Sequence, residues 1–175
     1  ISPTSFFQTN PAQTERLYGL VRAHLPTPVP VFYDLYCGAG SIGIFVQDKA
    51  QKIVGVEYSA TAVADAARNA ARNGLTHLAY EAGDMAAVLT EDFAARHGAP
   101  SAIITDPPRA GMDERVVRRL LALAAPRIVY VSCNPATLAR DLALLSEGYA
   151  VAAVQPVDMF PQTGHVEAVA LLERR

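Results

Sequence analysis

The feature that most constrains the fold is a regular alternation of short apolar runs with helical stretches from about residue 30 onward. The runs are rich in β-branched and aromatic residues, which is typical of buried strands. Seven such runs predict strands: 31–36, 52–57, 77–81, 101–106, 127–132, 149–157 and 165–173. The remaining stretches predict helices over 60–73, 113–124 and 135–147, and a helical lead-in over about 5–25.

Strand–helix–strand units with short connections require right-handed crossovers and therefore a mainly parallel sheet. The last two runs have no helix between them, so we expect them to pair antiparallel as a hairpin at one edge. A chain of 175 residues is long enough for one domain with one core. The expected fold is an α/β domain over residues 1–175 with a doubly wound, mainly parallel seven-stranded sheet.

Capping residues support the predicted helix ends. Ser59 is suited to be the N-cap of helix 60–73, and Asn73-Gly74 is suited to end it. Pro11 suits the first turn of the lead-in helix, because proline lacks the N–H that a first turn leaves unbonded. Helix 113–124 carries an apolar stripe that predicts a buried face, formed by Val116, Val117, Leu120, Leu121 and Leu123.

Composition excludes several classes of protein. Hydrophobic residues make up 51% of the chain and charged residues 18%, which argues against disorder. No apolar run reaches the roughly 20 residues that a membrane span needs, and the first residues do not form a signal peptide. The chain does not begin with Met, so we expect a fragment or a processed chain.

The charge and the cysteines set further expectations. Cys37 and Cys133 form neither a CxxC pair nor a disulfide framework, which indicates a reduced, cytoplasmic protein. The formal net charge of −2 gives no support to a nucleic-acid substrate, because such proteins usually carry a basic face. A role in nucleic-acid chemistry must therefore rest on the site residues. No metal site is expected.

Polar and glycine residues follow the predicted strands at the edge where ligands bind in parallel sheets. Gly38-x-Gly40-x-x-Gly43 follows the first strand and allows close backbone approach to a ligand. Glu57 ends the second strand, where it can bind both ribose hydroxyls, and Asp84 follows the third, where it can accept from an adenine amino group. The glycines alone also fit a tight turn without a nucleotide, or an NAD site.

The set of glycine turn, Glu57 and Asp84 resembles the class I S-adenosylmethionine methyltransferases, whose sheet also ends in an antiparallel hairpin. Nothing in the second half of the chain suggests a hydride-transfer site, which disfavours NAD. In related methyltransferases that act on amino nitrogens, the loop after the fourth strand ends in an aromatic residue that stacks on the base. Here Asp106-Pro107-Pro108 is followed by Arg109, and a proline-rich turn capped by Asp106 is the alternative interpretation.

Ser132-Cys133-Asn134-Pro135 places a cysteine between the fifth strand and a helix N-terminus, whose dipole should favour the thiolate. A thiolate can add to carbon 6 of a pyrimidine and make carbon 5 nucleophilic enough to take a methyl group. The carbon 5 proton must then leave, which requires a base. Glu167, with His165 close by, is the candidate. The alternative is a buried structural thiol.

Four segments together resemble the RNA uracil-C5 methyltransferase family, which makes 5-methyluridine in transfer and ribosomal RNA. They occur in the family's order over essentially the whole chain: Ser5-Phe6-Phe7-Gln8, Asp106-Pro107-Pro108-Arg109, Ser132-Cys133-Asn134-Pro135-x-Thr137-x-x-Arg140-Asp141 and Asp158-Met159-Phe160-Pro161-x-Thr163-x-His165-Val166-Glu167. The resemblance implies that Cys133 is the nucleophile and Glu167 the base.

The resemblance also implies a cofactor pocket for S-adenosylmethionine, lined by Gln8, Tyr36, Ser41, Glu57, Asp84 and Asp106. Asp106 would also face the uracil. His165 would be a supporting residue and Cys37 would pack near the glycine turn without a catalytic role. Arg140 and Asp141 would form either a structural ion pair or part of the catalytic site.

One departure from the family bears on the partner. Full-length members carry N-terminal RNA-binding regions that this chain lacks, so its RNA, transfer or ribosomal, is expected to bind mainly through missing regions. A monomer that does not associate with membranes is expected. RNA cytosine-C5 methyltransferases use the same addition but usually carry a cysteine where this chain has Arg109. An amino-group methyltransferase has no use for Cys133, and a non-catalytic S-adenosylmethionine-binding module needs neither Cys133 nor Glu167.

Overall fold

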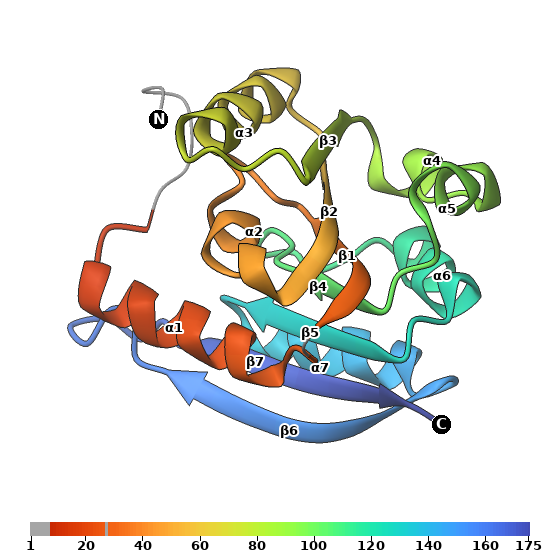
Figure 1. The fold of residues 1–175 in the computed structure, drawn as a ribbon. Helices are drawn as coiled ribbons and strands as arrows, with labels where there is room; N and C mark the ends of the chain where they lie inside the picture. Colours follow the sequence, from red (N-terminus) through yellow and green to blue (C-terminus); the bar gives the residue numbers. More distant parts are fainter. Residues whose placement is uncertain (1–7, 27) are drawn as a thin grey trace.

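The chain folds around one seven-stranded sheet with the strand order β3-β2-β1-β4-β5-β7-β6 (Figure 1). The computed structural model describes residues 8–26 and 28–175. The strands are β1 (Val29–Leu35), β2 (Ala50–Glu57), β3 (Leu78–Ala82), β4 (Ala102–Thr105), β5 (Arg127–Ser132), β6 (Tyr149–Val157) and β7 (Glu167–Arg174). β1 to β5 run parallel, and β7 pairs antiparallel with both β5 and β6. The predicted doubly wound sheet with an antiparallel hairpin is confirmed.

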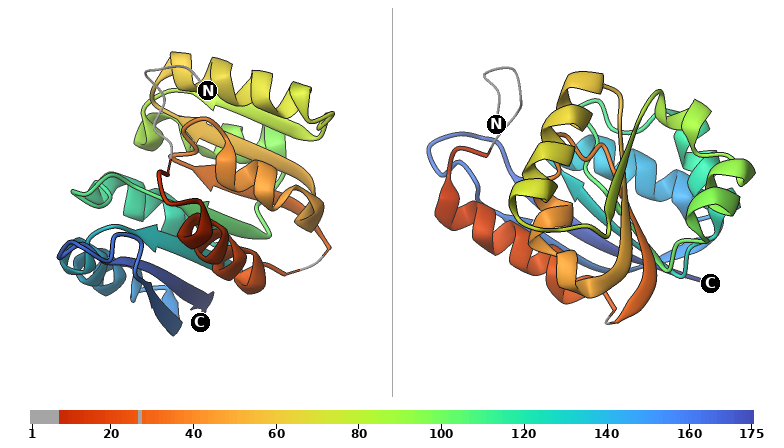
Figure 2. Two further views of the ribbon diagram at one scale, coloured as in Figure 1. Left: turned by 90° about the vertical axis from the view of Figure 1, so that its left-hand side faces the viewer. Right: turned by 45° about the horizontal axis from the view of Figure 1, so that its top comes forward.

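Helices cover both faces of this sheet, as the two views in Figure 2 show. One face carries α1 (Pro11–His24), α2 (Ser41–Phe45) and α3 (Ala60–Arg72). The other carries α4 (Met85–Val88), α5 (Glu91–His97), α6 (Glu114–Leu123) and α7 (Pro135–Leu145). A single 3-10 turn, η1 (Gln47–Lys49), leads into β2.

The central strands are buried on both faces because alternate side chains enter different cores. In β1, Phe32 packs with α1 and α2, whereas Tyr33 and Leu35 pack with the helices of the opposite face. All three side chains are fully buried. This double burial explains why the strand segments read as continuous apolar runs and not as alternating ones.

The predicted helix ends are confirmed where caps marked them. The Ser59 hydroxyl accepts a hydrogen bond from the Ala62 N–H, and α3 ends at Arg72. α1 starts at Pro11 with Asn10 as its N-cap. The lead-in was expected to begin at about residue 5, and its first residues lie outside the described part of the chain. The short helices α2, α4 and α5 were not predicted, because four to seven residues are too few to establish a helical period.

The strand order creates a crevice at the carboxyl edge of the sheet. The chain winds outward from β1 toward β3 and then returns to place β4 on the other side of β1. The loops after β1 and β4 therefore diverge, and ligands of open α/β sheets bind at such a point. Within the described residues, no helix combines the length and apolar character that crossing a membrane requires.

Candidate functional site

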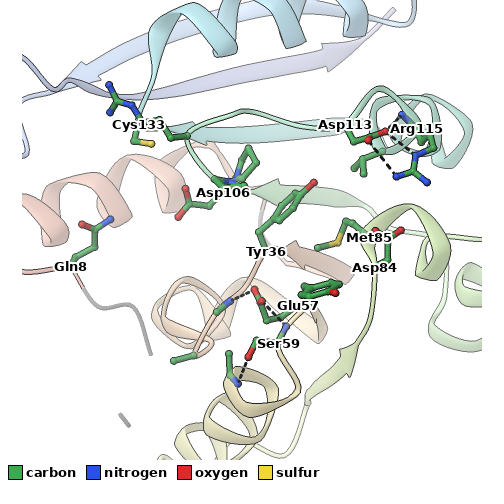
Figure 3. A pocket seen from close by; sticks show the side chains of 18 of the residues that line it. Gln8, Tyr36, Glu57, Ser59, Asp84, Met85, Asp106, Asp113, Arg115 and Cys133 are labelled. Carbon is green, nitrogen blue, oxygen red and sulfur yellow. Dashed lines mark hydrogen bonds and ion pairs between the residues drawn. The ribbon is translucent and has the colours of Figure 1, made fainter. Parts of the chain in front are cut away.

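A cavity of about 740 Å³ lies at this carboxyl edge (Figure 3). Its volume falls in the range of small-molecule and cofactor sites. All the predicted site residues except Ser41 line it: Gln8, Tyr36, Glu57, Asp84, Asp106, Cys133 and Glu167. Figure 3 shows Cys133 and Asp106 toward one end and Asp84, with the Asp113–Arg115 ion pair, toward the other. Tyr36 and Glu57 lie between the two ends.

The glycine turn after β1 uses backbone conformations that favour glycine. Tyr36, Gly38 and Gly40 all have positive φ angles, of 59°, 53° and 80°. A Cβ atom on Gly40 would lie 2.7 Å from the Tyr80 hydroxyl oxygen, so a side chain there would collide with β3. Because Tyr36 is not glycine, its left-handed conformation is strained, and the strain lies directly in the cavity wall.

Backbone N–H groups hold two carboxylates, Glu57 and Asp84, in the cavity wall near the glycine turn. Glu57 accepts hydrogen bonds from the N–H groups of Gly38 (3.2 Å) and Ser59 (2.9 Å), one at each carboxylate oxygen. Asp84 accepts from the Ala87 N–H at 3.0 Å and so caps α4. A carboxylate has about four acceptor positions, so both groups retain lone pairs for a ligand in the cavity.

A third carboxylate, Asp34, is buried beneath the glycine turn and was not singled out from the sequence. Its Oδ2 atom accepts from the Gly43 N–H at 3.0 Å. A Cβ on Gly43 would lie 2.9 Å from that oxygen, so the third glycine of the motif makes room for the acid. Burial raises the pKa of Asp34 to about 7, and nearby Glu57 adds to this, whereas the Gly43 hydrogen bond opposes it. An acid inside an apolar run was the available sequence signal.

The reaction end is assembled from three strands that are far apart in the sequence. Asp106 follows β4, Cys133 follows β5 and Glu167 opens β7. β5 pairs with β4 on one side and with β7 on the other, and Ser132 lies opposite Ala168 in the antiparallel ladder. The next step along each strand brings Cys133 and Glu167 to the same edge, beside Asp106.

Burial raises the pKa of Asp106, Cys133 and Glu167 at the reaction end of the cavity, and nearby carboxylates add to the change for Asp106 and Cys133. Burial first, then Glu167 and Asp34, raise the pKa of Asp106 to about 8. Burial raises the pKa of Glu167, and the Arg109 guanidinium opposes that change. The pKa of the Cys133 thiol is also raised, by burial and then by Glu167 and Asp106, with Arg109 again opposing. Burial and two carboxylates thus oppose the thiolate character that the helix dipole was expected to give Cys133.

Arg109 faces the strand β7 side of the site. Its Nη1 atom lies 3.1 Å from Nδ1 of His165, two residues before Glu167. The residue at the position of the aromatic of amino-directed methyltransferases is thus a cation in contact with the loop between β6 and β7. His165 takes a supporting position beside Arg109, and no hydrogen bond between His165 and Glu167 occurs among the described residues.

Other predicted residues lie elsewhere. The Ser41 hydroxyl lies 2.9 Å from the Tyr18 hydroxyl, on the α1 side of the glycine turn, and Ser41 does not line the cavity; its expected place in the pocket wall is wrong, because it begins α2 behind the turn. Cys37 is buried next to Tyr80, and burial raises the pKa of its thiol. Arg140 and Asp141 form an ion pair at 2.6 Å outside the cavity wall.

Some lining residues carried no sequence signal. Tyr58, Met85, Asp113 and Arg115 line the end near Asp84. Tyr58 follows Glu57 directly and is largely exposed, so its position beside a predicted ribose ligand was the only available hint. No trio of His, Cys, Asp or Glu side chains in residues 8–26 and 28–175 is arranged to hold a metal ion.

Comparison with known proteins was informative at the level of the family. The profile of the family described as tRNA (uracil-5-)-methyltransferase matches residues 2–175. An RNA methyltransferase of Bacteroides thetaiotaomicron, described as uncharacterized, is 51% identical over 176 residues, which cover 100% of this chain and 39% of that protein. A similar protein of Porphyromonas gingivalis is 50% identical and is covered to 38%.

Solved structures agree with this. The tRNA (uracil-54, C5)-methyltransferase of Pyrococcus abyssi, in complex with S-adenosyl-L-homocysteine, superposes with a TM-score of 0.85 at 36% identity, over 98% of this chain and 41% of that one. The N-methyltransferase NodS of Bradyrhizobium japonicum superposes over 95% of this chain and 89% of its own with a TM-score of 0.75, but at 16% identity it shows the fold alone. The chain spans about two-fifths of the length of its nearer relatives.

Proposed function

The chain belongs to the tRNA (uracil-5-)-methyltransferase family, and we propose that it transfers a methyl group from S-adenosylmethionine to carbon 5 of a uridine in RNA. The observation that carries this proposal is the convergence of Cys133, Glu167 and Asp106 at one end of a cavity whose other end suits a nucleoside. Neither end alone distinguishes this reaction from others of the same fold.

The residues present fit the cofactor. Glu57 suits the ribose hydroxyls and Asp84 suits the adenine amino group, with Tyr36 between them in the wall. The Gln8 side chain lines the cavity, and its Oε1 is buried without a hydrogen-bond partner among the described residues, as expected of an acceptor that awaits a ligand. When bound, S-adenosylmethionine supplies an electrophilic methyl group on its sulfonium.

Cys133 would start the reaction by forming a bond from its sulfur to carbon 6 of the uracil. The electron pair of the 5,6 double bond then moves toward carbon 5 and the carbon 4 oxygen, which makes carbon 5 nucleophilic. The thiol must lose its proton before this step, because its pKa is raised. Asp106 is a carboxylate beside it, and the ionised form of Asp106 can accept that proton, which leaves Glu167 ionised for the later step.

Glu167 would complete the reaction as the general base. After methylation, carbon 5 still carries its proton, and removal of this proton re-forms the double bond as the sulfur leaves carbon 6. A carboxylate whose pKa is raised is a stronger base than an exposed one, and burial raises the pKa of Glu167. The enzyme is thereby returned with a free Cys133.

The RNA itself, transfer or ribosomal, would bind mainly through regions beyond this domain. The described part of the chain shows a cavity for one nucleotide and a cofactor, and the formal net charge of −2 gives no general attraction for phosphates. A monomeric protein that works in the cytoplasm agrees with this proposal. The relatives' additional length leaves room for such regions.

The experiment that tests the proposal is intact-mass analysis after incubation with S-adenosylmethionine and RNA that contains 5-fluorouridine. Fluorine on carbon 5 does not leave as a proton does, so the reaction should stop as a covalent protein–RNA complex. The adduct should map to Cys133, disappear in Cys133→Ala and persist in Cys37→Ala. The longest available form of the protein should be used. Cofactor binding without an adduct on either transfer or ribosomal RNA would reject the uracil reaction.

A further inference from the structure

The polar residues at the start of α7 all contact the backbone of the loop that follows β4. Asn134 donates from its side-chain amide to the Arg109 carbonyl oxygen at 3.2 Å. The Thr137 hydroxyl shares its one proton between that oxygen at 3.2 Å and the Asn134 carbonyl oxygen at 3.1 Å. These contacts join two motifs that lie about 25 residues apart in the chain. Asn134 caps α7 through its side-chain oxygen, which accepts a hydrogen bond from the Ala136 N–H. This cap does not use the contacts with the Arg109 carbonyl oxygen, so those contacts need another explanation.

The next turn of α7 extends the same connection. Arg140 donates from Nη2 to the carbonyl oxygens of Ala110 and Met112, both at 3.0 Å. Asp141 is fully buried and accepts from the Met112 N–H at 2.7 Å and from the Tyr130 hydroxyl at 2.6 Å. Its second oxygen binds Arg140 at 2.6 Å. We call Asn134, Thr137, Arg140 and Asp141 the loop clamp.

The loop is shaped to receive this clamp. Gly111 has a φ angle of +77°, and a Cβ atom on it would lie 2.5 Å from Arg140 Nη2 and 2.7 Å from Asp141 Oδ2. Only a residue without a side chain allows the guanidinium and the carboxylate to approach the backbone so closely. Because every contact between the clamp and the loop is made to a main-chain N–H or C=O group of the loop, the clamp fixes the path of the loop itself.

The side chain that this loop carries into the site is Arg109. Arg109 and Cys133 line the same cavity. Three charged groups act on the Cys133 thiol, Asp106 and Arg109 on this loop and Glu167 on β7, and His165 contacts Arg109. Asp106 and Glu167 disfavour the thiolate, whereas Arg109 favours it. The position of one guanidinium therefore opposes two carboxylates.

We propose that the loop clamp positions Arg109 so that its guanidinium stabilises the Cys133 thiolate. The inference rests on the proposed function for the role of Cys133, and it makes the four clamp members positioning residues that act through Arg109. It gives the ion pair of Arg140 and Asp141, which lies outside the cavity, a role in the reaction. The competing explanation is a brace that only stabilises the packing of α7.

The test measures how fast iodoacetamide alkylates Cys133 as a function of pH, with the site of modification mapped by mass spectrometry so that buried Cys37 is scored separately. Arg109→Ala should move the midpoint of the alkylation profile up by about 0.5–1 pH unit, as expected when a nearby opposite charge is removed. At neutral pH the rate should then fall about three- to tenfold. Arg118→Ala, which removes an exposed arginine paired with Glu114, should leave the profile unchanged.

Variants of the loop clamp distinguish the positioning role from a brace that only stabilises packing. Thr137→Val and Arg140→Ala should shift the midpoint in the same direction as Arg109→Ala, whereas Thr137→Ser, which keeps the hydroxyl, should restore the normal profile. In an Arg109→Ala background, Arg140→Ala should add no further shift, because the residue through which it acts is already absent. Thermal unfolding of every variant is recorded in parallel.

Two outcomes would overturn the proposal. One is a lowered melting temperature in Thr137→Val and Arg140→Ala with the normal alkylation midpoint, which is the result expected of a brace. The other is a shift that adds fully to that of Arg109→Ala. Because alkylation needs neither RNA nor cofactor, these results are independent of the 5-fluorouridine experiment, whose failure would reject the uracil reaction and leave the clamp measurement standing.

Discussion

The two ends of the cavity are built in different ways. At the cofactor end, the backbone provides the shape: three positive φ angles form the turn, and main-chain N–H groups hold the Glu57 and Asp84 carboxylates. At the reaction end, the side chains of Asp106, Cys133 and Glu167 form the site; they follow β4, follow β5 and open β7. A helix, α7, holds the loop that carries Arg109.

This difference indicates how each end responds to substitution. A change at the cofactor end disturbs one local segment, so its cost should appear in ligand affinity or in stability. A change at the reaction end alters the balance of charges that several segments share, so its cost should appear in chemistry and in pH dependence. Four experiments test this contrast.

Glu167→Gln should have the largest effect. The amide cannot accept the carbon 5 proton, so turnover should fall about 10²- to 10⁴-fold, while the adduct between Cys133 and RNA accumulates. Affinity for S-adenosylhomocysteine, measured by calorimetry, should be unchanged, because the cofactor end is intact. Glu147→Gln, on an exposed residue, is the control. Normal turnover in the variant would assign the base elsewhere and remove the basis of the contrast.

Asp34→Asn should change the pH dependence of stability. Because the pKa of Asp34 is about 7 in the folded protein and 3.8 when unperturbed, the folded state holds the proton more tightly. The contribution of Asp34 is fully present below about pH 4 and is lost as pH rises toward 7, by at most about 4 kcal/mol. The variant should therefore lose less stability than the wild type between pH 4 and 7.

Urea unfolding at several pH values measures this difference, and exposed Asp92→Asn serves as the control. The slope of stability against pH is the quantity to compare, because the amide also changes hydrogen bonding at every pH. Equal slopes in the variant and the wild type would show that Asp34 is ionised in the folded protein, and that the cofactor end is more polar than its burial implies.

Glu57→Ala should weaken S-adenosylmethionine binding by about 1–3 kcal/mol, the cost of a ligand hydroxyl that loses its partner. Calorimetry measures the affinity, and exposed Glu15→Ala is the control. Cys133 alkylation should be unaffected, since the two ends are expected to respond separately. Unchanged affinity would remove Glu57 from the ribose site, and a changed alkylation profile would show that the two ends are coupled.

The smallest effect compares two glycines of one turn. Gly38 and Gly40 both have positive φ angles, but only a Cβ on Gly40 meets other atoms, at 2.7 Å from the Tyr80 hydroxyl. Both alanine variants should lose about 1 kcal/mol from backbone strain, and Gly40→Ala about 1 kcal/mol more from the contact. Thermal unfolding measures the difference, and Tyr80→Phe should reduce it. Equal losses of stability in the two variants would mean that the Tyr80 side chain on β3 moves to make room for the added methyl group.

The comparison of the two ends also separates the features that could be predicted from the sequence from those that could not. Ser59, Pro11 and the glycine turn act within a few residues of their position, and the predicted helix ends and turn were correct there. The apolar runs predicted the strands, and their alternation with helical stretches predicted the sheet type. Cys133 and Glu167 became candidates through their positions after the fifth strand and in the last strand, and a resemblance that spans four separate segments implied their roles.

What the sequence by itself determined is the strands, the longer helices and the candidates for the reactive groups, because apolar runs, caps and glycine conformation act over short distances along the chain. The tertiary structure alone decided that β7 inserts beside β5 and brings Glu167 to Cys133, that Ser41 turns away, and that α7 holds the Arg109 loop. It also buried the Cys133 thiol beside two carboxylates, and both effects raise the pKa of the thiol. Burial and charge interactions sum over every segment that encloses a group, and that sum exists only once the strands are in order.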